Sequence, residues 1–308
     1  MKQNFTYLSK DKETQIHAIA WKPDGEIKAI LQICHGMVEF IDRYSDFAEY
    51  LNRNGYFVVG NDHLGHGESV KNDEQHGYFH HPDGNACVIG DIRQLQIITQ
   101  EKYPNLPYFM LGHSMGSFLL RQYIEDYGSD LAGAIIMGTG SQPGAVLAAG
   151  KILCRAIAAF RGWHHRSNLI DGMAFGSYNK QFEPARTRCD WLTKEEMVVD
   201  AYLAHPWCTF QFTVNAYYNL FLTIQNAQNP QRIRKIPANL PLFLVSGACD
   251  PVGENGKGVK QAFQSYKDAG IQNIQLKLYE NDRHEILNET DRDNVYADIL
   301  EWLDARLK

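Results

Sequence analysis

The feature that most constrains the fold is a glycine-flanked serine between a short apolar run and a helical pattern. Gly112-His113-Ser114-Met115-Gly116 directly follows the apolar run 108–111 and precedes a helical pattern that extends to Tyr127. A strand that passes straight into a helix must turn sharply, and glycines two residues before and after the serine remove side chains that would collide there. The pattern predicts a strand–turn–helix unit with Ser114 at the turn as a nucleophile. A surface serine at an ordinary helix start is the alternative.

Strand and helix signals alternate on both sides of this junction. Strand patterns occur at 14–21, 29–34, 56–60, 134–137, 242–245 and 274–279, and helical patterns occur at 44–54, 83–102 and about 290–307. Short apolar runs of this kind are typical of strands buried in a parallel sheet. Repeated strand–helix units predict an α/β fold with a mostly parallel central sheet and helices on both faces.

The alternation stops in the middle third of the chain. From 141 to 236 we find helical patterns and no convincing core strand. We therefore expect an α/β core made of 1–140 and 237–308, with 141–236 as a helical cap inserted into it. Within the insertion, Thr193 and Glu196 have capping-box spacing, which predicts a helix with Thr193 as its N-cap.

Composition limits the partners and the compartment. The 308 residues carry a net charge of −6, so no global basic field indicates nucleic acid as a partner. The first residues lack the apolar core of a signal peptide, and no run approaches 18 apolar residues, so we expect a cytoplasmic protein. The six cysteines are scattered without a C-x-x-C pair, which predicts unpaired thiols and neither a disulfide nor a metal site.

A reactive serine needs a base, and the base needs a carboxylate to orient it. Of the twelve histidines, only His284 follows the last core strand, in a polar loop before the final helix. Asp250 follows the preceding strand, on a loop shaped by glycine and proline, and gives the chain order serine, acid, histidine. The alternatives are a surface-loop histidine, a turn aspartate before proline, and Asp282 as acid. Asp282 is disfavoured because it lies beside His284 on the same loop.

The negative charge that develops during acyl transfer needs two backbone N–H donors. Met115, the residue after the nucleophile, is expected to supply one. The loop after an earlier strand, Cys34-His35-Gly36-Met37, offers Met37 as the second, although a plain strand-ending turn is the alternative. The neighbouring residues expected to contact substrate are His35, Gly36, His113 and Val252.

Taken together, these motifs resemble the monoacylglycerol lipase and lysophospholipase branch of the α/β-hydrolases, which is also grouped with serine aminopeptidase S33-like hydrolases. The similarity rests on His35-Gly36-Met37-Val38-Glu39 with Arg43-Tyr44, Asp62-His63-Leu64-Gly65-His66-Gly67-Glu68-Ser69, Gly112–Gly116, Asp250-Pro251-Val252-Gly253 and Arg283-His284-Glu285. It covers the core, about two thirds of the chain. It implies a Ser114–Asp250–His284 triad, Met37 and Met115 as oxyanion donors, a helical cap inserted after the sixth strand, and no cofactor.

The resemblance implies a serine esterase with a small-molecule ester or lipid substrate. One departure is that Met37 and Val38 stand where the family usually has small residues, which is expected to narrow or reshape the acyl pocket. Aminopeptidase or thioesterase chemistry on the same triad stays open, whereas a non-catalytic ligand-binding relative would be expected to lack a triad member. Dehalogenases and epoxide hydrolases of this fold use an aspartate where this chain has Ser114.

The insertion carries features with two interpretations each. A basic cluster fits a solvated helix end or transient contact with an anionic membrane surface; it consists of Lys151, Arg155, Arg161, His164, His165 and Arg166. An aromatic run fits packing of the cap or the wall of an acyl tunnel; it consists of Phe210, Phe212, Tyr217, Tyr218 and Phe221. A peptidase would need cap carboxylates for the substrate ammonium, and the candidates are Glu183, Glu195, Glu196 and Asp200.

Overall fold

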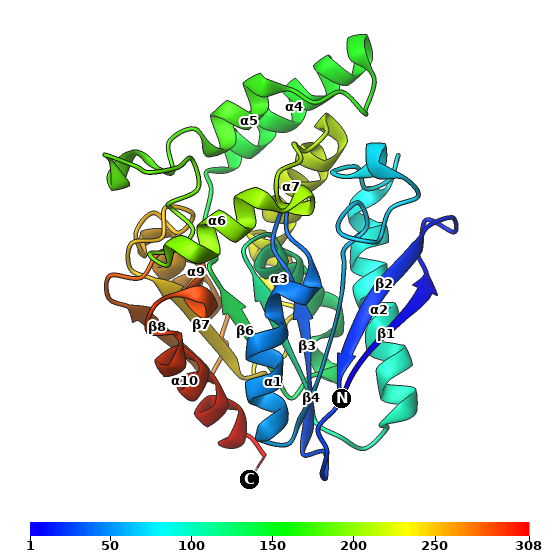
Figure 1. Cartoon of the computed structure of the whole chain (residues 1–308), viewed down its shortest axis with the longest axis vertical. Helices are drawn as coiled ribbons and strands as arrows, with labels where there is room; N and C mark the ends of the chain where they lie inside the picture. The colour runs from blue at the N-terminus through cyan, green and yellow to red at the C-terminus, as the bar shows by residue number, and fades with distance from the viewer. Residues whose placement is uncertain (308) are drawn as a thin grey trace.

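A computed structural model describes residues 1–307, and these form an eight-stranded sheet with helices on both faces (Figure 1). The strands are β1 (Lys2–Leu8), β2 (Gln15–Trp21), β3 (Ala29–Cys34), β4 (Tyr56–Asn61), β5 (Tyr108–His113), β6 (Gly133–Met137), β7 (Leu242–Gly247) and β8 (Ile274–Tyr279). Their spatial order is β1-β2-β4-β3-β5-β6-β7-β8. β3 to β8 are parallel to one another, while β1 pairs antiparallel with β2 and β2 pairs antiparallel with β4. The predicted mostly parallel α/β sheet is confirmed.

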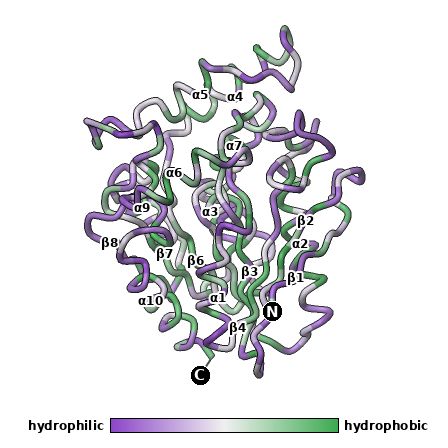
Figure 2. Tube along the Cα trace, in the orientation of Figure 1, coloured by the Kyte–Doolittle hydropathy of each residue, from purple (hydrophilic) through white to green (hydrophobic). Residues whose placement is uncertain are grey.

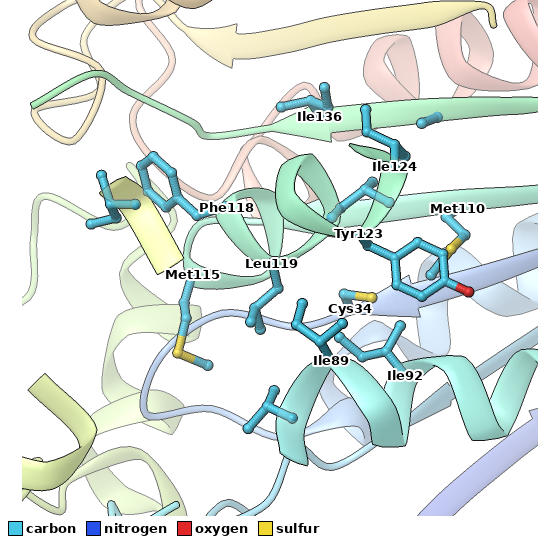
Figure 3. Close-up of a cluster of buried hydrophobic side chains, with 14 of the residues drawn as sticks. Cys34, Ile89, Ile92, Met110, Met115, Phe118, Leu119, Tyr123, Ile124 and Ile136 are labelled. Atoms are coloured by element: carbon cyan, nitrogen blue, oxygen red, sulfur yellow. The ribbon is translucent and has the colours of Figure 1, made fainter. Parts of the chain in front are cut away.

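Side chains of the central strands alternate between two apolar cores, one on each face. In β5, Tyr108 and Met110 lie in one core, while Phe109 and Leu111 lie in the other. The first core packs against α2 (Gly84–Lys102), α3 (Met115–Tyr127) and α9 (Lys257–Asp268), and Figure 3 shows part of it. The second packs against α1 (Ser45–Arg53) and α10 (Arg292–Asp304). Because both faces are covered, the central strands β3, β5, β6 and β7 are largely apolar, and the hydropathy colouring of the middle of the sheet is mostly green (Figure 2).

The chain between β6 and β7 forms helices and, within the described residues, no strand of the sheet. Its helices are α4 (Gly144–Arg161), α5 (Asn168–Phe175), α6 (Glu196–Ala204), α7 (Val214–Ala227) and α8 (Pro230–Ile233). We call residues 141–236 the cap segment. In Figure 1, α4 and α5 lie farthest from the sheet, and α6 and α7 lie between them and the strand ends. The insertion therefore stands above the carboxyl edge of the sheet.

The predicted capping box at the start of α6 is wrong. The N-cap of α6 is Glu195, whose side chain makes no capping bond. The Thr193 hydroxyl instead donates to the carbonyl of Asn288 at 3.1 Å and accepts from the N–H of Glu195. The Thr193 hydroxyl is therefore bonded to Asn288 of the core instead of capping the helix as the sequence spacing predicts.

All loops that carry candidate residues leave the sheet at the same edge. His35 follows β3, Ser114 follows β5, Asp250 follows β7 and His284 follows β8. The carboxyl ends of parallel strands meet at one edge, so residues far apart in sequence converge there. Among the described residues, no helix combines the length and the apolar character needed to cross a bilayer.

Candidate active site

Ser114 occupies a strained turn between β5 and α3. Its backbone has φ 54° and ψ −119°, a conformation that L-residues rarely adopt. The flanking glycines are required sterically. A Cβ atom at Gly116 would lie 2.6 Å from the carbonyl oxygen of His35, and one at Gly112 would lie 2.7 Å from the carbonyl carbon of Gly116. The turn is closed by the N–H of Ser114, which donates to the carbonyl of Met137 at 3.0 Å.

His284 and Asp250 meet although 34 residues separate them. Nδ1 of His284 lies 2.9 Å from Oδ2 of Asp250, and both side chains are buried. The other carboxylate oxygen of Asp250 accepts the N–H of Val252 at 2.8 Å, and Ser246 donates to Oδ2 at 3.2 Å. These bonds fix the carboxylate, which in turn fixes the orientation of the imidazole.

Asp282, the rival acid, faces away from this pair. Its carboxylate accepts a hydrogen bond from Lys194 of the cap segment at 2.6 Å. Burial raises the pKa of Asp282 to about 6, and Lys194 opposes that rise. The carboxylate that His284 contacts is Asp250.

The loop after β3 lies directly against Ser114. A Cβ atom at Gly36 would lie 3.1 Å from Cβ of Ser114, so only a glycine lets this backbone approach the serine so closely. Met37 follows at once and lines the same cavity as Ser114 and Met115. Met115 is the first residue of α3, so its N–H has no acceptor within the helix. Met37 and Met115 thus both border the cavity beside Ser114.

A buried ionic network underlies this loop. Arg43 donates to Glu39 at 2.6 Å and, in a bidentate pair, to Glu285 at 2.8 and 2.7 Å. Glu39 also accepts the N–H of Gly36 and the hydroxyl of Tyr44 at 2.9 Å. The N–H of Gly36, in the loop beside Ser114, therefore donates to the Glu39 carboxylate, whose charge Arg43 balances.

The network also reaches the loop of His284. Nδ1 of His113 lies 3.2 Å from Oε1 of Glu39, and its Nε2 lies 3.3 Å from the carbonyl of His284. Burial lowers the pKa of His113, but the hydrogen bond and charge of Glu39 outweigh it and raise that pKa above the ordinary value. Burial raises the pKa of Glu39, but His113 and Arg43 outweigh it and hold that pKa well below its usual range. Arg43 likewise lowers the pKa of Glu285 against the effect of burial.

Sequence reasoning assigned no role to Glu39, Arg43 or Glu285, although all three lie in the motifs that carry the family resemblance. Glu39 and Arg43 are four residues apart and could be paired from a helical spacing. The pair between Arg43 and Glu285 spans 242 residues, and no local pattern signals it.

A cavity of about 920 Å³ opens over Ser114 between the sheet edge and the cap segment. Its core side includes Met37, Ser114, Met115, Val252 and His284. The cap side is largely apolar and includes Val146, Leu147, Leu153, Phe175, Trp191, Phe210, Leu220 and Phe221. Polar groups gather beside the serine, namely Glu39, His113 and Glu285. This volume lies near the upper end of the range for small-molecule sites.

The four residues expected to contact substrate differ in whether they line the cavity. Gly36, His113 and Val252 line the cavity, and His35 does not. The His35 ring is fully buried, with Nδ1 2.7 Å from the carbonyl of Gly36 and Nε2 accepting the N–H of His63 at 2.9 Å. The structure thus gives His35 a place in holding two loops together, because both ring nitrogens are engaged by backbone groups.

The aromatic, basic and acidic residues singled out in the cap segment also differ in whether they line the cavity. In the aromatic run, Phe210 and Phe221 line the cavity, while Phe212 and Tyr217 are buried in the core of the segment. In the basic cluster, Arg166 is held by backbone carbonyls of Gln211, Glu74 and His76. None of the four carboxylates named for a peptidase lines the cavity; Glu196 and Asp200 pair with Arg186.

One group in the described chain brings metal-ligand types together, and it lies outside the cavity. His80, Asp83 and Cys87 place their ligand atoms within 4.8 Å of one another near the start of α2. Burial first, and then the Asp83 carboxylate, raises the pKa of the Cys87 thiol to about 12. The sulfur therefore keeps its proton near neutral pH, which disfavours metal binding. We assign no metal or cofactor to the site around Ser114.

This sheet topology and the arrangement around Ser114 define an α/β-hydrolase. The chain belongs to the serine aminopeptidase S33 family, Hydrolase_4, whose model matches residues 25–291.

Individual relatives agree with this membership. The chain is 24% identical over 302 residues to a monoglyceride lipase of Rattus norvegicus, covering 93% of this chain and 86% of the relative. It is 24% identical over 296 residues to a monoacylglycerol lipase of Mycolicibacterium smegmatis, covering 93% and 92%. Among solved structures, a thermostable carboxyl esterase from Bacillus coagulans in complex with glycerol matches with a TM-score of 0.93 and 26% identity, covering 100% and 99%.

Proposed function

We propose that this protein is a serine carboxylic-ester hydrolase with Ser114 as nucleophile, His284 as general base and acid, and Asp250 as the carboxylate that orients His284. The observation that carries the proposal is the convergence on one cavity. Ser114, in its strained turn, borders the same cavity as His284, whose ring is fixed by buried Asp250. Strain of this kind persists only where the surrounding structure enforces it, and it is typical of reaction centres.

The reaction follows from these positions. His284 accepts the proton of the Ser114 hydroxyl through Nε2, because Nδ1 faces Asp250. Ser114 Oγ attacks the ester carbonyl, and the oxygen that gains negative charge is stabilised by the N–H groups of Met37 and Met115. The alcohol leaves with the proton from His284. Water, deprotonated by His284, then attacks the acyl-enzyme and releases the acid and Ser114.

We further propose a monoacylglycerol-like substrate, an amphiphile with one acyl chain and an uncharged head group. The apolar cap side of the cavity suits an acyl chain, and the polar residues beside Ser114 suit a hydroxylated head. Two carboxylates, Glu39 and Glu285, border that polar region, and Arg43 is already paired with both. Because the charge of Arg43 is taken up by these two carboxylates, Arg43 offers no free cation to a phosphate beside Ser114, and we prefer a neutral head to that of a lysophospholipid. The monoglyceride lipases among the relatives support the same class.

A Ser114→Ala variant tests the catalytic assignment. We expect kcat for p-nitrophenyl butyrate to fall by at least ~10⁴-fold, because the members of a triad act as a unit. Ser129→Ala, at an exposed serine after α3, is the matched control and should keep full activity. A fluorophosphonate probe should add to the parent and the control and leave Ser114→Ala unlabelled. Activity of Ser114→Ala within tenfold of the parent would exclude the proposal.

A substrate profile tests the proposed substrate class. The parent enzyme should hydrolyse 1-monoacylglycerols faster than the lysophosphatidylcholines of the same chain, acyl-CoA thioesters or aminoacyl anilides. The four carboxylates named for a peptidase do not line the cavity, whereas Asp171 of α5 does and accepts the Tyr217 hydroxyl, so the aminoacyl anilides in this profile decide the peptidase alternative. A higher kcat/KM for lysophosphatidylcholine would refute the head-group argument and leave the triad assignment intact.

We also propose transient contact of the cap segment with a lipid surface. Five large apolar side chains are exposed on α4 and α5, namely Val146, Ile152, Phe160, Leu169 and Met173, with Phe160 89% exposed. These helices are the outermost part of the molecule (Figure 1), and Lys151 and Arg155 lie on α4 beside them. Apolar side chains with flanking cations are typical of interfacial helices. The cytoplasmic location and the division of the chain into a core, 1–140 and 237–308, and an inserted cap, 141–236, stay predictions.

A further inference from the structure

Val38, next to the proposed donor Met37, has a backbone conformation that its side chain disfavours. Its φ is +57°, in the left-handed region, where a β-branched residue is a genuine outlier. The side chain is only 9% exposed and borders the cavity. Glycine would adopt this φ without strain. A contact from elsewhere must therefore hold the Val38 backbone in place.

The cap segment supplies that contact. The hydroxyl of Tyr202, in α6, donates to the carbonyl of Val38 at 2.9 Å. Burial raises the pKa of Tyr202 well above its ordinary value, so the phenol stays a donor throughout the working range. The Tyr202 ring is itself fixed, because the Arg43 guanidinium lies 5.0 Å from its centroid and Arg43 is held by Glu39 and Glu285.

Other cap residues cover the same loop. The Phe40 ring lies 4.5 Å from His205 and 5.2 Å from Trp207. Within the loop, Glu39 accepts the N–H of Gly36, and Arg43 holds Glu39 in turn. The segment 36–40 is thus closed by its own carboxylate and covered by the end of α6, and the Tyr202 hydrogen bond is made to the one strained residue in it.

We propose that Tyr202 is a positioning residue, which keeps the Met37 N–H in oxyanion-binding geometry by holding the Val38 carbonyl. The oxyanion hole is then complete only when α6 is docked on the loop. This inference rests on the proposed function, since it needs an oxyanion at Met37 and Met115. Without the Tyr202 bond, Val38 relaxes toward negative φ and the peptide between Met37 and Val38 turns. This rotation displaces the Met37 Cα and with it the adjoining Gly36–Met37 peptide, which carries the Met37 N–H.

A direct contact between Tyr202 and substrate is the competing role, because Tyr202 also lines the cavity. The two roles differ in their dependence on Val38. If Tyr202 acts by holding strained backbone, a glycine at position 38 removes the need for it. If Tyr202 binds substrate, the residue at position 38 is irrelevant to its loss.

A double-mutant cycle separates these roles. Tyr202→Phe should lower kcat for p-nitrophenyl butyrate about three- to tenfold with KM unchanged, the effect of one lost hydrogen bond. Val38→Gly serves only as the second background, and Tyr202→Phe added to it should lower kcat less than about twofold relative to Val38→Gly alone. Tyr218→Phe, which removes a cap hydroxyl bonded only to Arg155, is the matched control with parental kinetics.

Ketone inhibitors give a readout that does not depend on turnover. A trifluoromethyl ketone adds Ser114 Oγ to its carbonyl carbon, the proton passes to His284, and the oxygen becomes an oxyanion. The methyl ketone of the same chain binds mainly without this addition. Tyr202→Phe should raise Ki for the trifluoromethyl ketone by the same factor by which kcat falls and leave Ki for the methyl ketone unchanged.

Equal effects of Tyr202→Phe in the parent and in the Val38→Gly background would overturn the inference. So would an effect on KM alone, or equal weakening of both ketones. Melting temperatures of all variants, measured in parallel, identify any loss caused by unfolding. If Ser114→Ala is inactive while the cycle is additive, only this inference fails. If Ser114→Ala keeps its activity, the proposed function fails first.

Discussion

Removing the Arg43 guanidinium should destabilise the protein strongly, and by an amount that depends on pH. Arg43 makes three hydrogen bonds of 2.6 to 2.8 Å to two buried carboxylates, Glu39 and Glu285. Arg43→Met keeps an apolar chain of similar length but leaves both carboxylates without a cation. Breaking a buried ion pair in this way costs about 3–5 kcal/mol. Because His113 stays beside Glu39, we expect a loss near the lower end, about 3 kcal/mol at neutral pH.

The pH dependence follows from the pKa shifts. In the parent, the pKa values of Glu39 and Glu285 lie below those of the unfolded chain, so their contribution is present at neutral pH and lost as the pH falls through the folded values. In Arg43→Met, burial remains without the guanidinium, so the pKa of Glu285 rises above its unfolded value, and that of Glu39 rises less because His113 still lowers it. The folded variant then binds more protons than the unfolded chain, and its stability falls as the pH rises. The gap between parent and variant should widen from about pH 5 to about pH 8.

Urea unfolding at several pH values measures this gap, and contributions common to both proteins cancel. Arg186→Met is the control, because Arg186 pairs with exposed Asp200 and should show no measurable loss. Combining Arg43→Met with Glu39→Gln and Glu285→Gln should recover most of the stability and remove the added pH slope. A loss for Arg43→Met that is no larger than the control's, or one that does not change with pH, would refute the argument.

Three further outcomes are expected. A Cβ atom at Gly116 would lie 2.6 Å from the carbonyl carbon of Cys34, so Gly116→Ala should lower the melting temperature by several degrees, whereas Gly172→Ala, in open space on α5, should not. Burial lowers the pKa of His66 well below its ordinary value, so below about pH 6.5 the unfolded chain binds a proton at His66 that the folded chain does not bind. In parallel urea titrations, lowering the pH should therefore reduce the free energy of unfolding more for the parent than for His66→Phe. Phe160→Asp should reduce co-sedimentation with anionic phospholipid vesicles without changing kcat for p-nitrophenyl butyrate, and unchanged sedimentation would contradict the proposed lipid contact.

The elements that sequence predicted best are those buried on both faces. β3, β5, β6 and β7 are continuous apolar runs, since helices cover both sides of them. β1 was not predicted, because this edge strand is mostly exposed and lacks a clear apolar alternation. α9 was also missed, although it packs Val259, Ala262 and Tyr266 into the first core.

In the candidate site too, residues that follow recognisable strands could be predicted from sequence, whereas contacts between distant residues could not. Ser114, Asp250 and His284 could be chosen from chain order, because each follows a recognisable strand. The hydrogen bond from Tyr202 to Val38 joins residues 164 positions apart across an insertion with no strand pattern to anchor it. The partners of Glu39 and the strain at Val38 depend on backbone geometry, which composition and periodicity do not encode.

Two strained residues, Ser114 and Val38, border the cavity, and different parts of the molecule hold them. The Ser114 turn is built by the sheet: its N–H bonds to Met137 at the end of β6, and the glycines around it are fitted to core backbone. The Val38 turn is held by Tyr202 of α6, in the cap segment. The proposed nucleophile Ser114 and one proposed oxyanion donor, Met115, are therefore held by the core, whereas the proposed donor Met37 depends on the docked cap. Loosening of α6 should then lower the rate of acyl transfer to Ser114 while labelling of Ser114 by small, highly reactive probes persists.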